Sequence, residues 1–155
     1  MTTTTNALRV AQVIRADREK LFRAWTDPAE LVHWWRMEEK GWSFAGASID
    51  LRVGGRYRLG MTSPEGKTHV AIGEYRVIDR PKRLAFTWDW DDPESAMGET
   101  LVTVEFNDVG GGATEVVLIH ERFPDSNRVS RHEHGWTQLL RLLDVAMREN
   151  VPSAG

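Results

Sequence analysis

Residues 129–147 read VSRHEHGWTQLLRLLDVAM, and their apolar side chains recur every three or four positions. This spacing is typical of an amphipathic helix with one buried face. Start signals precede it in Pro124-Asp125-Ser126-Asn127, and Pro152 follows as a stop signal. Twenty-odd residues at about 1.5 Å each give a helix of roughly 30 Å, which is long enough to cross a whole sheet.

Most of the chain before this helix predicts strands. From residue 47 to 121, runs of alternating apolar and polar residues are separated by turns rich in Gly and Pro. The clearest runs are Ile49, Leu51 and Val53, then Leu84, Phe86, Trp88 and Trp90. With a first strand at 8–14, we expect one curved, mostly antiparallel sheet of about seven strands. The mixed pattern at 70–78 leaves open which face of that strand is buried.

Two short helices are expected between the first strand and the rest of the sheet. Asp17 is placed to cap the first, whose Leu21, Phe22 and Trp25 form one stripe. Asp27-Pro28 opens the second, because Asp accepts from free N–H groups and Pro tolerates the first helical position. Its inward side is expected to carry Leu31, Trp34 and Trp35. The fold class is therefore α+β.

Composition limits the functional classes. The 155 residues predict a single domain over 1–155, with its core at about 8–149. A net charge of −3 lacks the excess of basic residues that is typical of nucleic-acid-binding proteins. The absence of cysteine excludes disulfides and thiolate chemistry. Residues 1–6 lack the features of a signal peptide, and no stretch has the ~20 apolar residues that span a membrane. We expect a cytoplasmic protein without membrane insertion.

Seven tryptophans are the strongest functional signal. Each indole carries an N–H that wants a partner when buried, so a solid core is filled more simply by aliphatic residues. Tryptophans pointing inward from both helices and strands suggest a cavity wall, although a thick core is the alternative. The candidate ligand-binding residues are Trp35, Trp42, Tyr57, Met61, Tyr75, Trp88, Trp90, His120, Trp136, Leu140 and Leu143.

Histidines are the main candidates for chemistry. His120 would face the apolar side of its strand, where it is either a satisfied core residue or a ligand or proton-transfer group. His132-Glu133-His134 has the wrong spacing for a metal site, since helical ligands lie four residues apart. We assign no metal, cofactor or catalytic residue.

Several segments, in this order, resemble a known family. They are Leu21-Phe22-Arg23-Ala24-Trp25-Thr26-Asp27-Pro28, Trp34-Trp35, Asp50-Leu51-Arg52-Val53-Gly54-Gly55-Arg56-Tyr57, Gly73-Glu74-Tyr75, Pro81-Lys82-Arg83-Leu84, Thr87-Trp88, Val102-Thr103-Val104-Glu105-Phe106 and Gly135-Trp136. Together they resemble the START-like (SRPBCC) helix-grip superfamily, and more narrowly the proteins related to the C-terminal domain of the activator of Hsp90 ATPase. The resemblance runs from about Leu8 to Met147 and implies the helix-grip fold.

The resemblance implies a bacterial stand-alone domain that binds a small, largely apolar ligand, aromatic or lipid-like, between sheet and C-terminal helix. A second copy of the chain is the expected protein partner, in a homodimer. The alternatives are a cyclase- or dehydratase-like enzyme on polyketide-type substrates, and a stress-related co-chaperone or regulatory protein. In the eukaryotic activator a separate N-terminal domain does much of the work on the chaperone, and we expect no such domain in this chain. We therefore expect binding rather than catalysis, and no direct Hsp90 activation.

Overall fold

The structure is a computed structural model, and it describes residues 6–149 of the chain. Seven strands and three helices lie in that range. They are β1 (Leu8–Ile14), α1 (Arg18–Thr26), α2 (Pro28–Leu31), β2 (Ser43–Ile49), β3 (Arg56–Thr62), β4 (Thr68–Asp79), β5 (Arg83–Trp90), β6 (Thr100–Gly110), β7 (Ala113–Glu121) and α3 (Ser126–Glu149). The expected helix stop at Pro152 lies outside the described residues.

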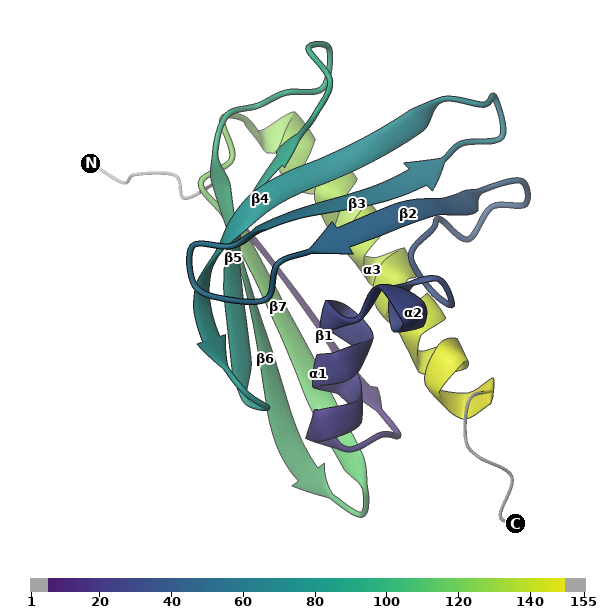
Figure 1. Cartoon of the computed structure of the whole chain (residues 1–155), viewed down its shortest axis with the longest axis vertical. Helices are drawn as coiled ribbons and strands as arrows, with labels where there is room; N and C mark the ends of the chain where they lie inside the picture. The colour runs from purple at the N-terminus through teal and green to yellow at the C-terminus, as the bar shows by residue number, and fades with distance from the viewer. Residues whose placement is uncertain (1–5, 150–155) are drawn as a thin grey trace.

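The strands form one sheet in the order β1-β7-β6-β5-β4-β3-β2, and all neighbouring strands are antiparallel. Strands β2, β3 and β4 run in a direction clearly different from β6 and β7, so the sheet is strongly bent (Figure 1). Helix α3 crosses the sheet, with α1 and α2 beside it (Figure 1). The predicted α+β helix-grip architecture is confirmed.

The strand predicted around Ile49 ends earlier in the structure than the sequence pattern indicated. The alternation of Ile49, Leu51 and Val53 predicted a half-buried face, but β2 already ends at Ile49 and the other two side chains are exposed. The chain turns tightly after Asp50, and the Gly55 N–H closes this turn by donating to the Arg52 carbonyl. A Cβ on Gly55 would lie 2.1 Å from the Asp50 carbonyl oxygen, so only glycine fits there.

The mixed pattern of β4 has a structural cause. Its register against β5 shifts between Tyr75 and Val77, which marks a bulge. A bulge adds one residue to one strand and reverses the side-chain alternation beyond it. Before the bulge, Ala71 and Tyr75 are buried, and the same face carries His69 toward the interior.

The helix caps follow the sequence signals. The Asp17 carboxylate accepts from the Lys20 N–H, and the Asp27 carboxylate accepts from the Ala29 N–H. Helix α2 is shorter than expected and ends at Leu31, so Trp34 and Trp35 lie in the turn that follows. Both are nevertheless fully buried, as predicted for the inward side of this segment.

The core lies between the inner face of the sheet and the three helices. The apolar stripe of α3 is buried as predicted, from Trp136 through Leu139, Leu140 and Leu143 to Met147. At about 1.5 Å per residue, the 24 residues of α3 extend about 36 Å. None of the helices within residues 6–149 combines the length and the apolar character that crossing a lipid bilayer requires.

Candidate ligand cavity

A cavity of about 820 Å³ lies between the first half of α3 and the sheet. This volume is within the range of roughly 300–1,000 Å³ that is usual for small-molecule sites. Helix α3 contributes a stripe of four residues three or four positions apart, which therefore share one helix face. They are Arg128, His132, Gly135 and Leu139. Strands β3, β4 and β5 supply the opposite wall, and the segment after α2 supplies one side.

Aromatic rings form the inner wall. Trp136 from α3 packs against Trp88 from β5, with ring centroids 4.9 Å apart, and against Trp35, at 5.9 Å. Further out, Trp90 continues the wall along β5 next to Trp88, at 5.3 Å. Aromatic contacts of this kind bury large apolar areas and leave flat surfaces on which another ring can stack.

The segment that follows α2 is fastened to α3. The Glu38 N–H donates to Oε1 of Gln138, and the Glu38 carboxylate pairs with the Arg141 guanidinium. This pairing lowers the pKa of Glu38 below its usual value. The two attachments position Met37 and Trp42 at the side of the cavity.

Polar groups gather at the outer end of the cavity, where α3 begins and the β5–β6 loop passes. The Arg128 guanidinium pairs there with the Asp125 carboxylate. Across the opening, the Glu94 carboxylate lies 3.6 Å from the Lys67 ammonium group. The cavity is therefore aromatic inside and polar at its mouth.

His132 joins α3 to β5 across this mouth. The Trp90 indole N–H donates to His132 Nε2 at 3.0 Å, and His132 Nδ1 lies 2.8 Å from the Arg128 carbonyl oxygen. Because Nε2 accepts, Nδ1 must carry the proton and donate to the carbonyl, which fixes a neutral imidazole. Burial lowers the pKa of His132, and the nearby Arg128 and Arg131 charges lower it further.

His120 is a core residue that the cavity does not reach. The Trp136 indole N–H donates to His120 Nδ1 at 3.1 Å, and His120 Nε2 lies 2.8 Å from Thr100 Oγ1. Thr100 itself donates to the Trp88 carbonyl, so His120 must donate from Nε2. Both ring nitrogens are thus engaged, and burial lowers the pKa of His120 to about 2. This geometry corresponds to a satisfied core histidine, whose two ring nitrogens are not free to exchange a proton with a ligand.

The structure places the eleven predicted ligand-binding residues in two groups. Those that line the cavity are Trp35, Trp42, Met61, Trp88, Trp90 and Trp136. Those that lie elsewhere are Tyr57, Tyr75, His120, Leu140 and Leu143. The two leucines belong to the second half of α3, where other side chains fill the space beneath the helix. Their expected position on the cavity wall is therefore wrong.

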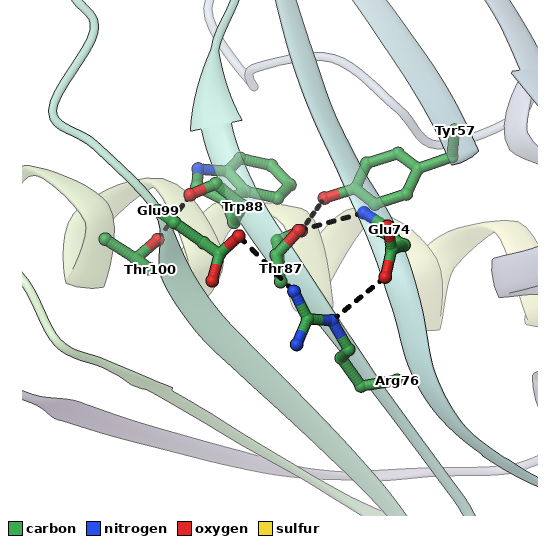
Figure 2. A network of polar contacts seen from close by, with 7 residues as sticks. All are labelled: Tyr57, Glu74, Arg76, Thr87, Trp88, Glu99 and Thr100. Atoms are coloured by element: carbon green, nitrogen blue, oxygen red, sulfur yellow. Dashed lines mark hydrogen bonds and ion pairs between the residues drawn. The ribbon is translucent and has the colours of Figure 1, made fainter. Parts of the chain in front are cut away.

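Tyr57 is held away from the cavity by a break in the sheet. Its hydroxyl donates to the Thr87 carbonyl, while Thr87 Oγ1 accepts from the Glu74 N–H, so side chains replace part of the β4–β5 ladder (Figure 2). Gly73 makes room, because a Cβ there would lie 2.7 Å from the Tyr57 ring. Burial raises the pKa values of both Tyr57 and its neighbour Tyr75.

A second hollow of about 380 Å³ lies over this break on the other side of Trp88. Arg76 bridges the carboxylates of Glu74 and Glu99 at its edge (Figure 2). The arginines and carboxylates of the hollow largely neutralise one another, so it presents no net charge that would select a ligand.

The predicted set omitted twelve of the cavity residues, among them His69, Arg131 and Leu139. His69 could have been found by extending the period-two face of Ala71 and Gly73 backward by one step. Leu139 lies in the predicted buried stripe of α3. His132 was weighed only as a metal ligand, although it precedes Trp136 by one helical turn. Within residues 6–149, no group of three His, Asp or Glu side chains is arranged to hold a metal ion.

Three buried indole N–H groups, those of Trp25, Trp35 and Trp88, lack a hydrogen-bond partner among the described residues. An unpaired buried donor costs about 1–3 kcal/mol. Edge-to-face contacts such as Trp25–Trp34, at 4.9 Å, offer these groups only weak compensation. The size and shape of these rings, rather than their hydrogen bonds, therefore account for their place in the core.

A bent antiparallel sheet gripped by a long C-terminal helix over a cavity defines the START-like, helix-grip class of proteins. Within that class, the chain belongs to the family described as activator of Hsp90 ATPase homolog 1-like protein, whose family model matches residues 15–148. None of the curated proteins compared with the chain matches it.

Solved structures agree with this assignment. The chain is similar to the AHSA1 protein from Silicibacter pomeroyi, at 28% identity and a TM-score of 0.77, covering 92% of this chain and 97% of that one. A protein from Chromobacterium violaceum matches at 27% identity and a TM-score of 0.77, covering 90% and 95%. An HSP90 activator from Plasmodium falciparum matches at 26% identity and a TM-score of 0.67, covering 91% and 95%.

Proposed function

We propose that this protein binds a small, largely apolar, aromatic molecule in the cavity beneath the first half of α3. The observation that supports this proposal most directly is the hollow of about 820 Å³ with five tryptophans in its wall. Removing apolar surface from water contributes about 25 cal/mol per Å², and ring stacking adds to it. A flat aromatic ligand would gain binding free energy from both the burial and the stacking.

Binding is favoured over catalysis by the state of two histidines, His120 and His132. Both ring nitrogens of each already make hydrogen bonds, so neither imidazole is free to exchange a proton with a ligand.

Gly135 offers a direct test because it lies on the cavity stripe of α3. A Cβ added to Gly135 meets no atom within 4 Å, so the position opens onto free space. Replacing a helical glycine by alanine stabilises by about 0.5–1 kcal/mol. A leucine there keeps the helical preference and extends a larger side chain along the cavity wall.

The probe is N-phenyl-1-naphthylamine, a neutral aromatic whose fluorescence rises in apolar surroundings. We expect saturable binding to the wild type and to Gly135→Ala. Gly135→Leu should weaken binding by roughly 5- to 150-fold, the equivalent of about 1–3 kcal/mol of overpacking. Circular dichroism checks that both variants fold. Absence of binding to the wild type, or equal affinity in both variants, would overturn the proposal.

A further inference from the structure

Among residues 6–149, the polar mouth of the cavity carries one arginine without an ion pair. Arg128 is paired with Asp125, and Lys67 is shared between Glu94 and Asp92. Two neutral groups are also engaged, because His134 Nε2 lies 2.8 Å from the Gln138 amide, and Ser95 donates to Asp92. Arg131 lines the cavity, is exposed, and makes no ion pair among residues 6–149.

Arg131 is close enough to the interior to act on a ligand there. Its side chain lines the cavity beside His132, whose ring lies between the helix and Trp90. The positive charge of Arg131 is the smallest of the causes that lower the pKa of His132. A guanidinium presents several N–H donors in one plane and matches the two oxygens of an acidic group.

We propose, building on the proposed function, that the ligand is an amphipathic organic acid. Its aromatic body lies between Trp88, Trp90 and Trp136, and its acidic group pairs with Arg131 at the mouth. This orientation places the apolar part of the ligand against the aromatic inner wall and keeps its charge at the polar mouth, near water. The reverse orientation would bury an unpaired charge among the aromatic rings, which costs much more free energy.

The test compares two probes that share one aromatic skeleton. N-Phenyl-1-naphthylamine is neutral, and 1-anilinonaphthalene-8-sulfonate adds one acidic group. Arg131→Gln should weaken binding of the sulfonate by about three- to tenfold, as expected for a partly exposed charge-assisted contact. It should change binding of the neutral probe less than about twofold. Arg15→Gln, which removes an exposed arginine that does not line the cavity, is the matched control.

Charge reversal gives a second, independent measurement. Arg131→Glu should weaken sulfonate binding more than Arg131→Gln does and leave the neutral probe bound. In the wild type, sulfonate binding should also raise the pKa of His132 in an NMR titration, because the anion offsets the Arg131 charge.

The outcomes separate the two proposals. If the wild type binds neither probe, both the proposed function and this inference fail. If the neutral probe binds but the two Arg131 variants leave sulfonate binding unchanged, only the acidic ligand is excluded. Equal loss of both probes in Arg131→Gln would assign Arg131 a role in shaping the wall and would also overturn the inference.

Discussion

The two halves of α3 face the same sheet and have opposite roles. From Leu140 onward the helix contributes Leu143, Ala146 and Met147 to a closed core. Before Trp136 the same face carries Arg128, His132 and Gly135 and borders a cavity. The difference teaches that one continuous helix can seal one part of a bent sheet and leave another part open. Side-chain composition along the stripe distinguishes the two parts.

The tryptophans follow the same division. Trp25 of α1 and Trp34 pack against each other in the core, and the Trp34 indole N–H donates to the Ala24 carbonyl. Trp88 and Trp90 lie beside the cavity. Both interpretations of the tryptophan content therefore apply, each to a different group of rings.

Removing Trp136 should have the largest effect, because it lies where the two halves of α3 meet. Trp136→Ala should lower the free energy of unfolding by about 3–5 kcal/mol. The ring contacts Trp25, Trp35 and Trp88, and its loss also leaves His120 Nδ1 unpaired. Urea unfolding measures this, and titration with N-phenyl-1-naphthylamine should show weaker binding per folded molecule.

Leu143→Ala is the control for the closed half. It should destabilise by about 2–5 kcal/mol and leave probe affinity per folded molecule unchanged, since Leu143 is fully buried away from the cavity. If Trp136→Ala also left the affinity unchanged, the contrast between the two halves would be lost.

Acid should destabilise the protein by a smaller amount. Burial depresses the folded-state pKa of His120 to about 2, whereas an unfolded histidine titrates near 6.5. Below pH 6.5 the unfolded chain binds a proton at His120 that the folded protein does not, and this favours unfolding. The contribution of His120 to the free energy of unfolding is therefore fully present above pH 6.5 and is lost as the pH falls. Between pH 7.5 and 5 we expect a loss of about 2 kcal/mol, with His132 adding in the same direction.

Urea unfolding across this pH range measures the loss. His120→Gln, which keeps an acceptor and a donor for the two partners of His120, should flatten the profile, and His33→Gln at an exposed position should not. An equally steep profile in His120→Gln would show that other groups control the response to acid.

Trp90→Phe should have the smallest effect on stability. It removes the indole donor to His132 and should cost about 1 kcal/mol. Loss of that donor removes a hydrogen bond to the neutral imidazole, so the pKa of His132 should rise. NMR titration of His132 measures this shift. Trp42→Phe, which alters another ring of the cavity wall, should leave that pKa unchanged, and a similar shift in both variants would contradict the assigned bond.

Much of the fold could be predicted because it depends on local periodicity. The strict alternation of Leu84, Phe86 and Trp88 fixed a buried strand face, and the spacing from Trp136 to Met147 fixed the buried face of α3. The caps at Asp17 and Asp27 also formed as expected, since a cap needs only neighbouring N–H groups. Local spacing failed at Leu51 and Val53, where a turn that depends on Gly55 takes the chain out of the sheet.

The sequence by itself determined the sheet, the long helix and the presence of too many indoles for a simple core. Only the tertiary structure decided which rings enclose the cavity and which groups the ring nitrogens of His120 and His132 contact. Trp90 and His132 are 42 positions apart, and His120 and Trp136 are 16 apart. No periodic pattern encodes such pairs, because they form only when the bend of the sheet and the crossing of α3 bring distant segments together.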